Sequence, residues 1–225
     1  MARMPRPLFV TVFCMVSWLA THVAAEQPRT KIDLASNGIG APPADFEFWQ
    51  SGPGEAGQWA IVRDSTAATA ASIEHVSTDT ADDRYPLAIY KPISAKNVEV
   101  SAHVKVVRGR MESAGIAVRL VSPDNYYVAR VNALEERVEL VRVVNGKTEQ
   151  IAGTETDIYR DHWHTLGIRV EDERFTVSID GKLLFTAFDR TFLRDGQVAL
   201  WTEEDNVTRF EEIEIAALPF SAKDQ

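Results

Sequence analysis

The chain has 225 residues, with 24 Lys and Arg against 33 Asp and Glu, which gives a formal net charge of −9. Its hydrophobic fraction of 45% and charged fraction of 25% are ordinary for a globular protein and argue against intrinsic disorder of the bulk. The acidic balance argues against nucleic acid as a partner, because affinity for phosphates rests on Lys and Arg.

The first 25 residues have the pattern of a secretory signal peptide. Arg3 and Arg6 precede an apolar run over residues 8–20, and small residues follow at 23–25, where a signal peptidase cuts. The run is shorter than the roughly 20 apolar residues that span a bilayer. We therefore expect a secreted or periplasmic protein without membrane contact after cleavage, and the alternative is an uncleaved anchor.

Removal of residues 1–25 would take away the only cysteine, Cys14, and leave 22 basic and 33 acidic residues, a net charge of −11. Without cysteine, the mature chain has no disulfides, thiolate nucleophiles or cysteine metal ligands. Its chemistry must then come from carboxylates, arginines, histidines and aromatic side chains.

Three segments follow the signal sequence. Residues 26–43 are rich in proline and glycine and are interpreted as an N-terminal leader, residues 44–218 as the domain, and residues 219–225 as a polar tail. Within the domain the apolar residues recur with period two, which is typical of half-buried strands. The longest example is the alternation of apolar and polar residues over 98–106.

The same alternation predicts further strands, centred on residues 116–120, 127–131, 138–140, 166–170, 175–179, 198–200 and 213–215. Turn signals separate them at 122–125, 144–147, 179–182 and 194–196. Asn145-Gly146 and Asp180-Gly181 are typical of two-residue hairpin turns, in which both central residues take positive φ. At least two antiparallel hairpins follow.

No long apolar stripe with helical spacing is present, and residues 65–72 are interpreted as a surface loop. About a dozen strands without helices indicate an all-β fold of two packed antiparallel sheets. We expect one β-sandwich.

Several segments resemble exported bacterial laminin-G-like, or concanavalin-A-like, jelly-roll proteins of the 3-keto-disaccharide hydrolase type. The resemblance lies in residues 115–119, 124–133, 137–147, 162–166, 180–185, 196–202 and 207–213. It implies a two-sheet antiparallel jelly-roll β-sandwich with a concave sugar-binding face, and it raises a hydrolase reading. The Glu-x-Asp-x-x-Glu signature of retaining glucanases is absent at 211–214, which argues against that chemistry.

Strict period two places four side chains on one sheet face, away from the apolar positions of their strands: Arg119, Tyr126, Arg130 and Asn132. Arginine and asparagine offer several donors to hydroxyl groups, and tyrosine adds a flat apolar face. The sequence thus predicts a ligand surface here, extended by the nearby Arg137 and, along the chain, Arg142. The alternative is a solvated face on which Arg130 or Arg137 pairs with Glu135 or Glu139 across strands.

Trp201 ends a predicted strand and precedes the acidic residues Glu203, Glu204 and Asp205. An indole can stack on a sugar ring while carboxylates accept its hydroxyls, but tryptophans are usually well buried. Trp201 is therefore either a further ligand contact or a cap on the edge of the core.

Glycoside hydrolysis needs two carboxyl groups roughly 5–10 Å apart, one with a raised pKa. The candidates are Glu135, Glu203 and Asp205. Such pairs arise easily by chance in a chain with 33 acids, and an ion pair with Arg130 or Arg137 would lower the pKa of Glu135.

No metal site is expected from histidine, because His162 and His164 lack an evident third ligand. Calcium is a candidate cofactor in this superfamily, with Asp45, Asp205 and Asn206 as oxygen ligands. No other cofactor is expected.

Three functions remain open at this point. The first is an exported sugar-binding or adhesion-type domain without catalysis, the second a glycoside hydrolase acting on 3-keto-disaccharides or related glycans, and the third a protein-interaction domain of the cell envelope. The expected partner is a glycan, and the oligomeric state is not specified by the sequence.

Overall fold

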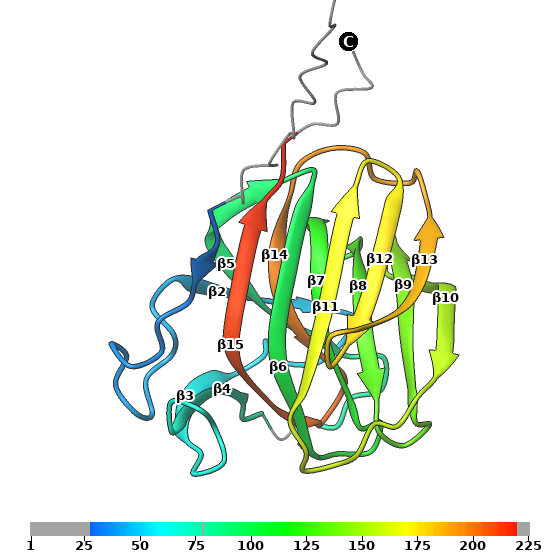
Figure 1. Ribbon diagram of the computed structural model, residues 1–225. Coiled ribbons are helices and arrows are strands. Elements are labelled where there is room, and N and C mark those ends of the chain that lie inside the picture. Colours follow the sequence, from blue (N-terminus) through cyan, green and yellow to red (C-terminus); the bar gives the residue numbers. More distant parts are fainter. Residues whose placement is uncertain (1–27, 78, 220–225) are drawn as a thin grey trace, which may run out of the picture.

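The structure is a computed structural model that describes residues 28–77 and 79–219 (Figure 1). The expected signal peptide and nearly all of the expected C-terminal tail lie outside the described residues. In the described part, no helix is long and apolar enough to cross a membrane.

The described residues form two antiparallel sheets, as the sequence predicts. The order of sheet A is β13 (Lys182–Phe188), β12 (Arg174–Ile179), β11 (His164–Glu171), β6 (Val98–Arg108), β15 (Val207–Ala217), β4 (Ala71–His75) and β3 (Trp59–Arg63), with β1 (Thr30–Lys31) also paired to β15. The order of sheet B is β10 (Lys147–Glu155), β9 (Arg137–Val144), β8 (Asn125–Asn132), β7 (Ser113–Ser122), β14 (Gly196–Thr202), β5 (Tyr85–Ala95) and β2 (Phe46–Ser51). Figure 1 shows the two sheets as front and rear layers of a sandwich, which is the predicted jelly-roll architecture.

The main core lies between the sheets and contains the inward residues that the period-two pattern identifies. On β6 these are Val98, Val100, Ala102 and Val104, each with an exposed fraction of 1% or less. Residues of β7, β8, β11 and β12 meet them from both layers. Burial of this apolar surface is the main favourable contribution to folding, as expected for a domain without disulfides.

The two predicted hairpin turns have the expected backbone. Asn145 and Gly146 have φ of 51° and 75°, and Asp180 and Gly181 have 49° and 75°. Positive φ at both central residues suits the right-handed twist of the flanking strands. These turns join β9 to β10 and β12 to β13.

Sheet B has a second apolar cluster on its outer face, which the sequence reasoning did not separate from the first. Its members come from five strands, at alternate positions except across the irregular part of β7: Tyr85, Leu87, Ile89, Ala117, Leu120, Tyr126, Val128, Val141, Val143, Ala199 and Trp201. Much of the outer face is therefore occupied by packed apolar side chains, and polar side chains gather toward one end of it.

Two segments outside the regular strands are packed onto the sandwich. In the expected leader, Leu34 is buried in the main core, and Gly40 and Ala41 exchange backbone hydrogen bonds with Ile61. The expected loop at 65–72 ends earlier than predicted, because β4 begins at Ala71. Its remaining residues contact sheet A, where Glu211 accepts hydrogen bonds from the Ala68 N–H at 2.8 and 3.0 Å. Residues 28–43 thus belong structurally to the sandwich.

Candidate functional site

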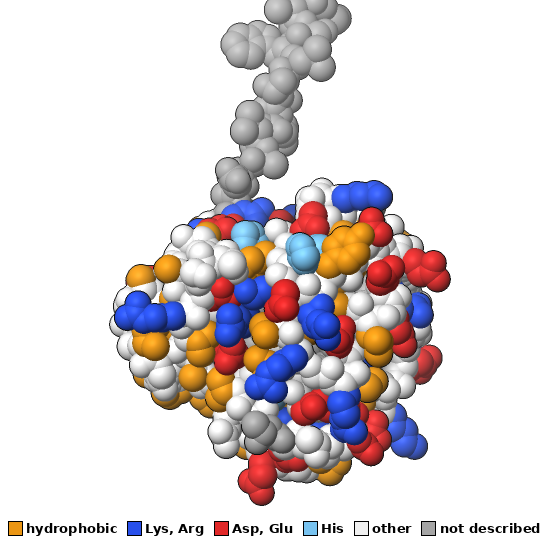
Figure 2. All heavy atoms as spheres, turned by 90° about the horizontal axis from the view of Figure 1, so that it is seen from below, with side chains coloured by type: hydrophobic (Ala, Val, Ile, Leu, Met, Phe, Trp, Pro, Cys, Tyr) orange, Lys and Arg blue, Asp and Glu red, His pale blue; other side chains and the backbone are white. Residues whose placement is uncertain are grey.

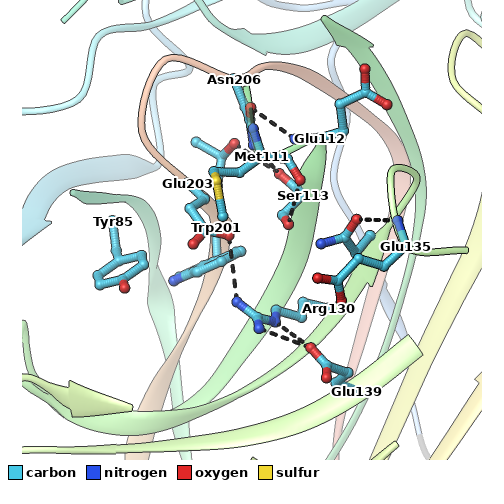
Figure 3. Close-up of polar contacts among 12 residues, drawn as sticks. Tyr85, Met111, Glu112, Ser113, Arg130, Glu135, Glu139, Trp201, Glu203 and Asn206 are labelled. Atoms are coloured by element: carbon cyan, nitrogen blue, oxygen red, sulfur yellow. Dashed lines mark hydrogen bonds and ion pairs between the residues drawn. The ribbon is translucent and has the colours of Figure 1, made fainter. Parts of the chain in front are cut away.

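The polar end of the outer face of sheet B is organised around Arg130 (Figure 3). Its Nε and Nη2 lie 2.9 and 2.8 Å from Oε2 of Glu139, the residue directly opposite it on β9. Its Nη1 lies 3.4 Å from Oε2 of Glu203, which follows β14. One guanidinium therefore bridges two carboxylates from different strands.

Gly115 makes room for this arrangement. It lies between Arg130 and Trp201 in the register of sheet B. A Cβ at Gly115 would approach the Ala129 carbonyl oxygen to 2.7 Å. The missing side chain leaves the Arg130 guanidinium carbon 5.8 Å from the centre of the Trp201 ring, within the range of a cation–π contact.

A second arginine continues the charged network. The Nε of Arg137 lies 3.2 Å from Oε1 of Glu139, but at an angle that makes no hydrogen bond, so the contact is one of charge. Its Nη1 lies 3.8 Å from Glu135, whose side chain is 56% exposed. Two guanidiniums and three carboxylates thus alternate, and the end of the sandwich in Figure 2 likewise mixes acidic and basic side chains.

Glu203 is one of the buried acids of the network, with an exposed fraction of 6%. Burial raises the pKa of its carboxyl group, and the charge of Arg130 opposes that rise. Desolvation disfavours a carboxylate more than a single long ion pair favours it. Glu203 therefore has the environment of a group that holds a proton more readily than an exposed glutamate.

Trp201 and Tyr126 are buried beside this network rather than open to a ligand. Trp201 is 1% exposed, stacks on Tyr85 with ring centres 5.6 Å apart, and donates its Nε1–H to the Tyr126 hydroxyl at 3.2 Å. Burial raises the pKa of Tyr85 to about 12. Of the two interpretations of Trp201, packing is the one that the structure shows.

Arg119 does not lie on the predicted ligand face, and this expectation is wrong. It has φ of 48°, and the pairing of β7 with β8 is irregular between Val118 and Ser122. This bulge turns the side chain out of the strict alternation. The guanidinium is fully buried and donates to the carbonyl oxygens of Lys96, Phe192 and Asp172.

The Asn132 side chain is also used in hydrogen bonds within the fold. Its side-chain oxygen accepts hydrogen bonds from the backbone N–H groups of Leu134 and Glu135, both at 2.9 Å. This local bonding is typical of asparagine in turns. Of the predicted ligand residues, Arg130, Arg137 and Arg142 have partly exposed side chains, at 22%, 30% and 28%. Arg142 pairs with Glu149 and Asp189 and does not join Arg130 and Arg137.

The residues considered for calcium are not brought together. Asp205 accepts the backbone N–H of Arg110 at 3.1 Å, and buried Asn206 accepts those of Met111 and Glu112. Asp45 precedes β2 and lines a cleft that Tyr90 also lines. Asp205 also faces Arg110 rather than Arg130, so it does not belong to the charged network.

His162 and His164 make hydrogen bonds with residues of nearby turns. His164 Nδ1 lies 2.9 Å from Asp180, and its Nε2 accepts the Tyr159 N–H at 3.2 Å. His162 contacts the Arg160 carbonyl oxygen. Among the described residues, no group of three or more potential side-chain ligands could hold a metal ion.

The sequence reasoning missed two members of the site as functional residues. Glu139 was considered only as the partner in an ion pair, and that cross-strand pair is present. Tyr85 gave no signal, because its strand lies in a stretch without clear alternation. The pairing of β8 with β9 across the connection at residues 133–136 places Glu139 opposite Arg130, and neither of the two predicted hairpin turns lies there.

Comparisons with known proteins support the fold. No family model matches the chain, and no curated protein matches it. Among solved structures, it is similar to a carbohydrate-binding module, CBM66, from Bacillus subtilis, with a TM-score of 0.60, 20% identity, and coverage of 76% of this chain and 95% of that one.

Two further structures extend the comparison. The exoplasmic/lumenal domain of VIP36, in a form bound to Ca²⁺ and Man3GlcNAc, has a TM-score of 0.54 at 17% identity, covering 86% of this chain and 90% of that one. The β-glucanase of Bacillus licheniformis has a TM-score of 0.50 at 8% identity, covering 78% of this chain and 99% of that one. At these identities the shared property is the fold, and the chain is a two-sheet antiparallel jelly-roll β-sandwich.

Proposed function

We propose that the protein is an exported glycan-binding domain whose ligand surface is the charged network of Arg130, Arg137, Glu135, Glu139 and Glu203. The observation that carries the proposal is the Arg130 guanidinium held between two carboxylates, next to a buried Trp201–Tyr85 stack. Export rests on the signal-peptide pattern of residues 1–25.

The chemistry of the network suits hydroxyl-rich ligands. Sugars present hydroxyls that both donate and accept, and alternating guanidinium and carboxylate groups supply donors and acceptors at fixed positions. The packing of Trp201 under Arg130 holds the guanidinium in place, which lowers the entropy lost when a ligand binds. The names of similar structures, a carbohydrate-binding module and a domain bound to Man3GlcNAc, support the same class of ligand.

Hydrolysis is the second candidate, and Glu203 is the observation that favours it. Its pKa is raised by burial, as a general acid requires. Glu139 contacts the same guanidinium, so the two carboxyl groups lie on either side of one Arg130 side chain, as a pair of acid groups that act on one substrate requires. In this version the substrate is a 3-keto-disaccharide or a related glycan, with Glu203 as the acid and Glu139 as its partner.

A glycan array followed by calorimetric titration tests the binding proposal. Arg137→Ala removes exposed donors without leaving Glu203 unpaired, so we expect a protein that folds and binds the glycan at least about tenfold more weakly. Arg190→Ala is the matched control, because Arg190 lies in the connection from β13 to β14 and its side chain is 74% exposed. Equal glycan affinities of the two variants would show that the charged network is not part of the binding site.

Turnover separates the two candidates. The purified protein is incubated with a panel of disaccharides that includes 3-keto sugars, and released monosaccharides are measured. If the wild type forms product, and Glu203→Gln binds the glycan but forms none, the protein is a hydrolase. Binding without product supports the binding domain.

A further inference from the structure

A polar cleft of about 300 Å³ lies away from the charged network, between the connection from β1 to β2 and the start of β2. The lining residues that matter for its chemistry are Lys31, Asp33, Asn37, Asp45, Phe46 and Tyr90. Its volume is at the lower end of the range for pockets that bind small molecules. The residues of the proposed glycan site do not line it.

The walls of the cleft are fixed by the fold. Leu34 is buried in the main core beside Asp33, and the Asn37 side chain bonds the connection to itself by donating to the Asp33 carbonyl oxygen and accepting the Ala44 N–H, both at 3.1 Å. On the other side, Phe46 pairs with Tyr90 in sheet B. A cleft held in this way is largely formed before a ligand arrives.

Tyr90 is the feature that turns the cleft into a candidate site. It is 6% exposed, and its ring packs on Phe46 with ring centres 5.4 Å apart. Within the described residues its hydroxyl makes no hydrogen bond, yet it is not among the polar atoms sealed from solvent. Because Tyr90 lines the cleft, the small exposed part of this side chain opens into it. Buried hydroxyls normally have partners.

The charges around this hydroxyl are negative. The Asp45 carboxylate lies close enough to raise the pKa of Tyr90, although burial contributes more to that rise. Within residues 28–77 and 79–219, neither Asp33 nor Asp45 has a cationic partner. Lys31 is directed to Glu212 at 3.1 Å, and Lys91 donates to the Ala44 carbonyl oxygen.

We propose that this cleft binds a small organic ammonium ion, whose N–H groups donate to the Asp45 carboxylate and to the Tyr90 hydroxyl oxygen. Asp33 adds a second negative charge at the rim. A charge-assisted hydrogen bond to a carboxylate is about twice as strong as a neutral one, and an unpaired hydroxyl gains its missing partner. A divalent metal fits less well, because no third carboxylate or imidazole converges here.

Calorimetric titration of the purified protein with 1,4-diaminobutane at neutral pH and low salt tests the proposal. We expect saturable binding of one equivalent, weakened about tenfold by Asp45→Asn. Tyr90→Phe keeps the packing on Phe46 and removes only the hydroxyl, so it is expected to weaken binding several-fold. Asp195→Asn, which removes one exposed acidic charge elsewhere, is the matched control and leaves the affinity unchanged.

Three results would overturn the assignment. One is the absence of saturable binding at millimolar diamine. Another is equal weakening by Asp45→Asn and Asp195→Asn, which would mean attraction to the overall negative charge. The third is calcium chloride or neutral 1,4-butanediol binding in the cleft as tightly as the diamine, with the same dependence on Asp45.

Discussion

Arg130 on β8 and Glu203 beyond β14 lie 3.4 Å apart, although 73 residues separate them in the chain. The contact joins two strands that are not neighbours, since β7 lies between β8 and β14. It crosses above Gly115, the position in β7 without a side chain. The proposed site therefore depends on the register of three strands.

The raised pKa of Glu203 gives a pH-dependent prediction. Because the folded pKa lies above that of the unfolded chain, the carboxyl costs stability once pH rises above its ordinary value of 4.5, and costs nothing below it. The stability of Glu203→Gln relative to the wild type should therefore be higher at pH 7 than at pH 4. Urea unfolding at both pH values measures this. A relative loss at pH 7 would contradict the assigned direction.

His75 should make the fold sensitive to acid. Burial lowers its pKa from 6.5 to about 4, and its Nδ1 lies 2.8 Å from the Asn206 carbonyl oxygen. The unfolded chain binds a proton as pH falls below 6.5, so stability is lost between pH 6.5 and about 4, by about 3 kcal/mol in total. In His75→Gln, which does not titrate, we expect most of this pH-dependent loss to disappear. A loss as large as that of the wild type would assign the acid sensitivity to other groups.

Asp64 is expected to be a strong contributor to stability. Burial alone would raise its pKa, but hydrogen bonds from Lys105, Thr66 and Arg209 together hold the pKa well below its usual range. Asp64→Asn leaves two cations without their shared partner and should cost about 3–5 kcal/mol at pH 7. The cost should vanish only as pH falls through the low folded pKa. Thermal unfolding of Asp64→Asn, with Asp195→Asn as the control variant, measures this loss of stability.

Arg119 should matter for stability and not for ligand binding. Arg119→Met keeps much of the side-chain volume but removes the donors to three carbonyl oxygens. Each buried acceptor left unpaired costs about 1–3 kcal/mol, so we expect a loss of about 3 kcal/mol or more in the free energy of unfolding. Arg174→Met, at a 52% exposed position, should change it little. An equally small change in the free energy of unfolding for Arg119→Met and Arg174→Met would contradict the structural role of Arg119.

Much of the fold was accessible from the sequence because side-chain alternation is strict where one strand face meets the core. The apolar positions of β6, β8 and β9 were placed correctly, as were the hairpins at Asn145-Gly146 and Asp180-Gly181. On β7 the irregular pairing after Val118 moves Leu120 from the predicted core face to the outer apolar cluster. Alternation assigns faces but does not say whether the opposite face meets solvent. Alternation therefore predicts Tyr126 as a ligand contact and leaves Trp201 undecided, whereas in the structure an apolar cluster buries both side chains.

The site was predicted in part for the same reason. Arg130 and Arg137 follow the alternation and have exposed edges, whereas Arg119 lies at a bulge that no local signal marks. Glu203 was one of many acids, and its approach to Arg130 depends on strands that are distant in sequence. Its burial, which distinguishes it from Glu135, is a property of the folded chain.

The most direct test of the central claim is calorimetric titration of a glycan selected on an array into the wild type, Arg137→Ala and Arg190→Ala. The account predicts saturable binding that Arg137→Ala weakens at least about tenfold and Arg190→Ala leaves unchanged. Equal affinity in all three proteins, or no binding by the folded wild type to any glycan of the array, would contradict it.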